Sequence, residues 1–213
     1  MKAELSVALL NSEGRLISEV KQPSKSFVRS FISLLYVLHT YLKISEQDIS
    51  NTARTLASTT SWSSLQLVSK GGGVTELVAG RRPDYGGGNI ALTITGDYLG
   101  IQVGSGSTAP TPTNYALQTR IAHGQGAGQL VYVGCEVEPP VISAPNATML
   151  IRRYFTNKSG GDVTVWEVGM YAAGMTSIAT GYVFLICRDV LGAAITVANT
   201  QLLRVEYTLQ VTV

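Results

Sequence analysis

The strongest constraint on the fold is the segment from Val131 to Val213, which alternates apolar and polar residues in short runs. The runs read VYVGCEVE, ATMLIRRYFTN, DVTVWEVGMYA, GYVFLICRDV and LLRVEYTLQVTV, and Gly, Pro, Asn and Asp separate them. A period of two with β-branched and aromatic residues is typical of half-buried strands. Closely spaced strands of this kind predict a mainly β fold, with an antiparallel β-sandwich or jelly-roll-like body.

The composition favours protein partners. Charged residues make up 14% of the 213 residues, against about 25% in an average soluble domain. A surface so poor in charge is often covered by another protein, and we expect copies of the same chain and other proteins as partners. The net charge of +2 gives no electrostatic reason to expect nucleic acid or an anionic membrane as a ligand.

The first stretch, residues 1–60, is predicted to contain a β-hairpin and one long apolar helix. Leu5–Leu10 and Arg15–Val20 flank the turn-forming residues Asn11–Gly14. Ser24 is a plausible N-cap for the helix. The apolar positions that follow are three and four residues apart: Phe27, Phe31, Leu34, Leu35, Leu38, Tyr41 and Leu42.

The expected helix is apolar on most sides, and two positions for it stay open. It packs in an interface with a neighbouring subunit, or it covers the open face of its own sheet. The segment from Phe27 to Leu42 is too short to span a bilayer and contains Arg29 and His39. The first residues, with Glu4 before a short apolar run, do not resemble a signal peptide.

The rest of the chain divides into a loop-rich arm with short strands, residues 61–128, and strands that complete the sandwich, residues 129–213. We expect both to form one compact unit with the first stretch. Dense Gly, Ser, Thr and Pro residues in the arm suggest ordered loops that contact a neighbour, above all Gly71–Gly88. The residues predicted to make protein contacts are Phe27, Phe31, Leu35, Leu38, Arg81, Arg82 and Tyr85.

Glycine-rich motifs do not indicate nucleotide binding or a nucleophilic serine. Gly124, Gly126 and Gly128 precede a strand and not a helix, so they are better explained as a bend between strands. The run Gly104–Ser107 lacks the order of a nucleophile elbow. The sequence therefore predicts no cofactor site.

Titratable residues also give no catalytic or metal-binding pattern. His39 and His123 are the two histidines of the chain, and we expect each to make a structural hydrogen bond. Glu136 and Glu138 share one face of a strand, and the prolines after them suggest solvated charges at a strand end. We expect no catalytic residue, no metal ion and no enzymatic activity.

The strand around Arg152 places neighbouring side chains on opposite faces, Arg152 with Tyr154 and Arg153 with Phe155. Both arginines are expected at an edge, in solvent or in salt bridges. Cys135 and Cys187 lie in apolar runs and are expected to be small buried residues, although a disulfide between them cannot be judged from sequence.

A second hairpin is predicted where Arg153–Thr156 and Val163–Val168 flank Asn157–Gly161. Alternation places Trp166 and Val168 on one face of the second strand. We expect burial of Trp166 to stabilise the core by about 3 kcal/mol or more.

Three segments resemble structural proteins of tailed bacteriophages: Gly100–Tyr132, Arg152–Ala172 and Phe184–Val213. They read GIQVGSGSTAPTPTNYALQTRIAHGQGAGQLVY, RRYFTNKSGGDVTVWEVGMYA and FLICRDVLGAAITVANTQLLRVEYTLQVTV. The opening SEGRLISEVKQPSKSFVRSFISLLYVL is similar to the N-terminal halves of such proteins, whereas the stretch from Asn51 to Asn89 matches little. The resemblance implies a virion component with a β-sandwich body.

Three roles follow from this resemblance and from the composition. The favoured role is a capsid decoration (cement) protein, or one attached to the head or neck, that assembles in the host cytoplasm and binds by many repeated contacts. The alternative within the virion is a tail, baseplate or fibre-adaptor protein. A rival class is a carbohydrate- or receptor-binding module, with Trp62, Tyr85 and Tyr98 as sugar-stacking candidates.

Overall fold

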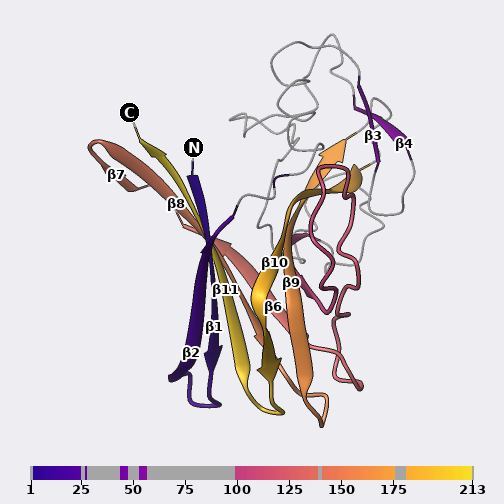
Figure 1. The fold of residues 1–213 in the computed structure, drawn as a ribbon, viewed down its shortest axis with the longest axis vertical. Coiled ribbons are helices and arrows are strands. Elements are labelled where there is room, and N and C mark those ends of the chain that lie inside the picture. Colours follow the sequence, from indigo (N-terminus) through magenta and orange to yellow (C-terminus); the bar gives the residue numbers. More distant parts are fainter. Residues whose placement is uncertain are drawn as a thin grey trace.

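The computed structural model of the chain describes residues 2–24, 27, 44–47, 53–56, 99–138, 141–175 and 181–212. Within these residues the fold is mainly β and contains no helix (Figure 1). The strands are β1 (Lys2–Leu10), β2 (Leu16–Pro23), β3 (Ile44–Gln47), β4 (Ala53–Leu56), β5 (Gly100–Gly104), β6 (Val131–Val137), β7 (Val141–Ser143), β8 (Asn146–Thr156), β9 (Val163–Met175), β10 (Gly181–Val197) and β11 (Leu202–Thr212).

The strands form two main antiparallel sheets. The larger sheet has the order β2-β1-β11-β8-β6, and β7 pairs with the beginning of β8. The smaller sheet has the order β10-β9-β5. A separate two-stranded sheet joins β3 and β4. The mainly β, antiparallel fold that the alternation predicts is therefore confirmed.

The inner faces of the two main sheets share one hydrophobic core. The larger sheet contributes Leu5 and Val7 of β1 and Tyr207 of β11, while the smaller sheet contributes Ile101 of β5 and Phe184 of β10. All five side chains are fully or almost fully buried. Burial of a large apolar side chain is worth about 1.5–3 kcal/mol, so this core holds the two layers together.

The first hairpin forms as the sequence predicts. In the turn, the side-chain oxygen of Asn11 accepts hydrogen bonds from the backbone N–H of Glu13 at 2.9 Å and of Arg15 at 2.8 Å. Gly14 takes a φ of 80°, which glycine adopts without steric cost. β1 then pairs with β2 so that Val7 faces Val20.

The second predicted hairpin is wrong, because β8 and β9 lie in different sheets. Asn157 explains the crossing: its side-chain amide donates to the carbonyl oxygens of Gly161 at 2.8 Å and Val197 at 2.7 Å. Its backbone bonds Gln201 and Thr200 in the neighbouring β10–β11 connection. Two arches therefore pass side by side from one sheet to the other, and a turn-like composition alone does not distinguish an arch from a hairpin.

The predicted alternation along β9 is also wrong in its second half. Val165 and Val168 both lie in the core, although they are three residues apart, so the strand changes phase between them. The pairing of β9 with β10 shifts register at the same place. Trp166 is consequently only half-buried and is not one of the core side chains, and Glu167 points to the outer face of the smaller sheet.

The predicted helix from Phe27 to Leu42 lies outside the described residues, apart from Phe27. That residue is half-buried and makes an isolated antiparallel bridge with Cys187. In the described part of the chain, no helix has the length and hydrophobicity needed to cross a membrane.

Candidate functional site

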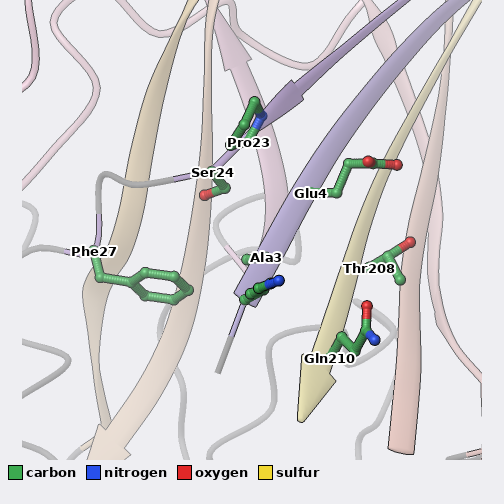
Figure 2. Close-up of a pocket in the computed structure, with 8 residues that line it drawn as sticks. Ala3, Glu4, Pro23, Ser24, Phe27, Thr208 and Gln210 are labelled. Carbon is green, nitrogen blue, oxygen red and sulfur yellow. The ribbon is translucent and has the colours of Figure 1, made fainter. Parts of the chain in front are cut away.

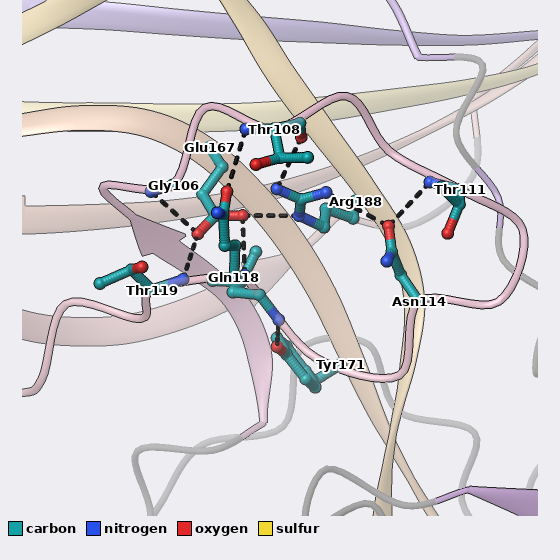
Figure 3. A network of polar contacts seen from close by, with 10 residues as sticks. Gly106, Thr108, Thr111, Asn114, Gln118, Thr119, Glu167, Tyr171 and Arg188 are labelled. Atoms are coloured by element: carbon teal, nitrogen blue, oxygen red, sulfur yellow. Dashed lines mark hydrogen bonds and ion pairs between the residues drawn. The ribbon is translucent and has the colours of Figure 1, made fainter.

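A buried carboxylate fixes a long loop to the outer face of the smaller sheet (Figure 3). Glu167 of β9 accepts hydrogen bonds through Oε1 from the backbone N–H of Gly106 at 3.1 Å and of Thr119 at 2.8 Å. Through Oε2 it accepts from the N–H of Gln118 at 3.1 Å and from Arg188 Nε at 2.6 Å. Both ends of the loop are thus bound to one side chain.

Arg188 of β10 carries the network to the middle of the loop. Its Nη2 donates to the carbonyl oxygen of Thr108 at 2.9 Å, and its Nη1 donates to Asn114 Oδ1 at 3.2 Å. The same Asn114 oxygen accepts the N–H of Thr111 at 2.8 Å. The side chains of Arg188 and Glu167 are 2% and 0% exposed, so the ion pair lies away from water.

Glycine and tyrosine residues complete this anchoring. A Cβ atom on Gly104 would lie 2.5 Å from Glu167 Oε1, and one on Gly106 would lie 2.5 Å from Gln118 Cβ, so neither position has room for a side chain. Tyr171 Oη accepts the N–H of Leu117 at 2.6 Å, and burial raises the pKa of this tyrosine. The glycines of Gly104–Ser107 therefore allow close packing on Glu167.

The loop held in this way presents an uncharged surface, here called the loop surface and defined as residues 105–119. No charged residue occurs in it. Ser107, Thr108, Ala109 and the segment Thr111–Thr113 are exposed, while the anchoring groups beneath are buried. Because each Glu167 oxygen is already occupied by two donors, the network positions a loop and offers no free base or nucleophile.

A second uncharged surface, here called the flange, consists of residues 141–150 and the facing residue Leu209 of β11. Figure 1 shows β7 and the start of β8 projecting away from the smaller sheet, at the upper left. Val141 is 62% exposed and Ile142 is 82% exposed. Ile142 pairs with Ala147, and Met149 pairs with Leu209, so these four apolar side chains share the face that continues into the core.

Several charged side chains of the larger sheet lie on its outer face and form ion pairs with one another. Arg152 forms ion pairs with Glu206, with Glu138 at 3.2 Å and with Glu136 at 3.8 Å. The hydrogen bond that Arg152 Nε donates to the Glu206 carboxylate raises the pKa of Arg152. Glu136 and Glu138 are thus largely solvated partners of an arginine, as expected for charges at a strand end.

The two neighbouring arginines have different surroundings, and the expectation for Arg153 is wrong. Arg153 is 1% exposed, and its guanidinium donates to the carbonyl oxygens of Val133 at 2.8 Å, Leu99 at 2.8 Å and Ile101 at 3.0 Å. The predicted division of faces is correct, but the inner face at this point offers backbone acceptors that satisfy a buried cation.

Other polar groups lie between the sheets. Asp189 Oδ2 accepts hydrogen bonds from Ser24 Oγ at 2.7 Å and from Tyr207 Oη at 3.0 Å. Burial raises the pKa values of Tyr207 and of the neighbouring Cys187 thiol, which keeps both groups protonated. Cys135 and Cys187 are free and buried, so the expectation of small buried residues is confirmed.

A pocket of about 620 Å³ opens beside Ser24, near the start of β1 and the ends of β2 and β11 (Figure 2). Its lining includes one aromatic side chain, Phe27, and Ser24, whose hydroxyl donates to Asp189. The residues that line it are Lys2, Ala3, Glu4, Pro23, Ser24, Phe27, Thr208 and Gln210. Across the described ranges, no three His, Cys, Asp or Glu side chains gather in a way that could hold a metal ion.

Some of the residues singled out in the sequence lie within the described part of the chain, and others lie outside it. His123 makes the expected structural hydrogen bond, because its Nδ1 accepts the N–H of Tyr132 at 3.0 Å. Gly124 and Gly128 have positive φ values in the bend before β6, which agrees with their predicted role. The positions outside the described residues are Phe31, Leu35, His39, Leu38, Trp62, Arg81, Arg82, Tyr85, Tyr98 and the segment Gly71–Gly88.

The loop surface and the flange were not among the predicted contact residues. Their sequence signals are weak: a run without charges from Gly104 to Thr119, and another from Val141 to Ile151. Comparison of the chain with protein-family models, curated proteins and solved structures finds no match.

Proposed function

We propose that this chain is a structural component of a tailed-phage virion and that it acts by repeated protein–protein contacts. The favoured place is the capsid, as a decoration (cement) protein, or the head or neck. A jelly-roll arrangement of the two sheets is part of the same proposal. The resemblance of three segments to such proteins and the low fraction of charged residues support it.

The main support for the proposal is the buried Glu167–Arg188 ion pair, which holds an exposed loop in place. A buried ion pair adds little net stability, because the desolvation of both charges offsets their attraction. Here the pair and its backbone bonds fix an exposed, uncharged loop in one conformation. Ordering a loop before binding lowers the entropy cost of association, which is useful for a protein that binds partners.

Many weak contacts, repeated by the symmetry of a particle, add up to firm attachment. Uncharged surfaces suit this role because their binding depends little on salt. The proposed mechanism therefore needs no reactive group, only shape and a fixed loop.

Purified particles test this function. An antibody raised against the purified chain is used to probe particles of the phage or prophage whose genome encodes it, after separation on a density gradient. We expect the chain to sediment with intact particles, and its absence from them refutes the proposal. Copies per particle, measured by quantitative mass spectrometry, distinguish a decoration protein, with hundreds of copies, from a tail or baseplate part, with few.

A further inference from the structure

We propose that the loop surface of one copy binds the flange of a second copy, so that the chain assembles head to tail. This inference rests on the proposed structural function and names the partner of its contact surface. It combines two observations: the distribution of charge over the described surface, and the positions of the loop surface and the flange, which are two of its uncharged stretches.

The described surface separates charged from uncharged regions. Charged side chains cover the outer face of the larger sheet, where they pair with one another: Glu19, Lys21, Glu136, Glu138, Arg152, Arg204 and Glu206. The loop surface and the flange carry none. A partner with charges over either region would lose hydration of those charges without compensation, so each region fits an uncharged partner.

The flange has the stronger need of a partner. Its inner face extends the core: Met149 and Leu209 pack against buried residues, whereas Ile142 is 82% exposed. Covering such a side chain removes apolar surface from water, which favours association. The loop surface offers what would cover it, since Ala109 and Pro112 are apolar, exposed and carried by a loop whose base is fixed by Glu167 and Arg188.

The two surfaces lie on opposite sides of the molecule. In Figure 1 the flange projects at the upper left, and the magenta loop lies on the right of the smaller sheet. The loop surface and the flange of one copy therefore cannot bind each other, but each can bind the other kind of surface on a second copy. A contact between two different surfaces is heterologous, and it repeats from copy to copy into a ring or a filament.

Charge insertion tests the contact. Ala109→Glu places a charge on the loop surface, Ile142→Glu places one on the flange, and Leu16→Glu is the matched control. Leu16 is 58% exposed and lies in β2, outside both surfaces. By sedimentation velocity, the natural chain and L16E form species that grow with concentration, while A109E and I142E each stay monomeric.

Mixing the two blocked variants distinguishes this model from others. A109E keeps its flange and I142E keeps its loop surface, so an equal mixture forms dimers and no larger species. A mixture that stays monomeric refutes the inference. A contact between like surfaces would instead leave one of the two variants able to assemble on its own, which also refutes it. A natural chain that stays monomeric at all concentrations, or variants that assemble as it does, refutes it too.

Cysteine pairs give a readout that does not depend on charge or on the folding of the glutamate variants. Under mild oxidation, an equal mixture of A109C and I142C chains forms a disulfide-linked dimer, whereas L16C with I142C does not. Cys135 and Cys187 are buried and do not compete. Equal yields from both mixtures refute the contact. Particle association is measured separately, so the virion function can hold where this contact fails, and the reverse.

Discussion

Replacing Glu167 by glutamine removes the charge at the centre of the loop anchor and keeps its shape. Oε1 can still accept the N–H groups of Gly106 and Thr119. The new amide NH2 takes the place of Oε2, which accepted hydrogen bonds from Gln118 N and Arg188 Nε. These two N–H groups then face another donor and have no acceptor there. Arg188, 2% exposed, is left as a buried cation without its counter-charge.

The cost follows from that burial. Removing one partner of a buried ion pair destabilises a protein by about 3–5 kcal/mol. For a domain of this size we expect a fall in melting temperature of roughly 6–20 °C. The matched control is Glu136→Gln, because Glu136 is 61% exposed and lies 3.8 Å from Arg152. Exposed pairs contribute about 0–1 kcal/mol, so the control stays close to the natural chain.

Urea unfolding followed by circular dichroism measures the free energy of unfolding of both variants. Hydrogen exchange then shows where stability is lost. In E167Q we expect faster exchange of the amides of Gly106, Gln118 and Thr119, which bond the carboxylate, than of the β1–β11 ladder. A change below 0.5 kcal/mol in E167Q, with unchanged exchange in the loop, refutes the view that this pair holds the loop surface in place.

Three further expectations use neighbouring or matched positions. Arg153→Ala should lower the free energy of unfolding by about 3 kcal/mol or more, because three buried carbonyl oxygens lose their hydrogen-bond donor. Arg152→Ala, at the more exposed neighbouring position, should lower it by about 1 kcal/mol. Equal losses in urea titrations contradict the environments assigned to the two arginines. Gly104→Ala should lower the free energy of unfolding by about 1–3 kcal/mol, because its Cβ would lie 2.6 Å from the carbonyl oxygen of Thr119. Gly134→Ala should be nearly neutral, because its Cβ would meet nothing within 4 Å. Thermal melts of the two variants rank their stabilities. Burial raises the pKa of the Cys187 thiol above its usual 9.0, so above about pH 9 the folded chain keeps a proton that the unfolded chain releases. The free energy of unfolding therefore falls as the pH rises above about 9. A Cys187→Ala variant should show a smaller fall with pH, and an unchanged fall speaks against a protonated buried thiol.

Local patterns in the sequence predict local structure well in this chain. The turn residues Asn11 and Gly14 predict the first hairpin, and alternation around Arg152 assigns each side chain to the correct face. Both features depend on residues that are near one another along the chain. Such patterns state which side of a strand is apolar, but not what covers that side.

The loop anchor could not be predicted, because its parts are far apart in sequence. Arg188 bonds Thr108, 80 residues away, and Glu167 bonds Gly106, 61 residues away. Nothing near Glu167 indicates that the phase of β9 changes there, so alternation placed Trp166 in the core. The phase change and the arch at Asn157 are both consequences of pairing between strands, which the sequence of one strand does not contain.

The same dependence on distant residues bears on function. A loop ordered by its own turn residues would keep its shape if detached, but the loop surface owes its shape to Glu167 and Arg188 on two strands of the smaller sheet. Its binding competence should therefore be lost together with the ion pair, while the flange, built on β7 and β8 of the larger sheet, keeps its own. In the mixing experiment, E167Q should therefore be able to replace A109E: its flange binds the loop surface of I142E, and the mixture forms dimers and no larger species. If E167Q chains lengthen assemblies as the natural chain does, the anchor is not what prepares the loop for binding.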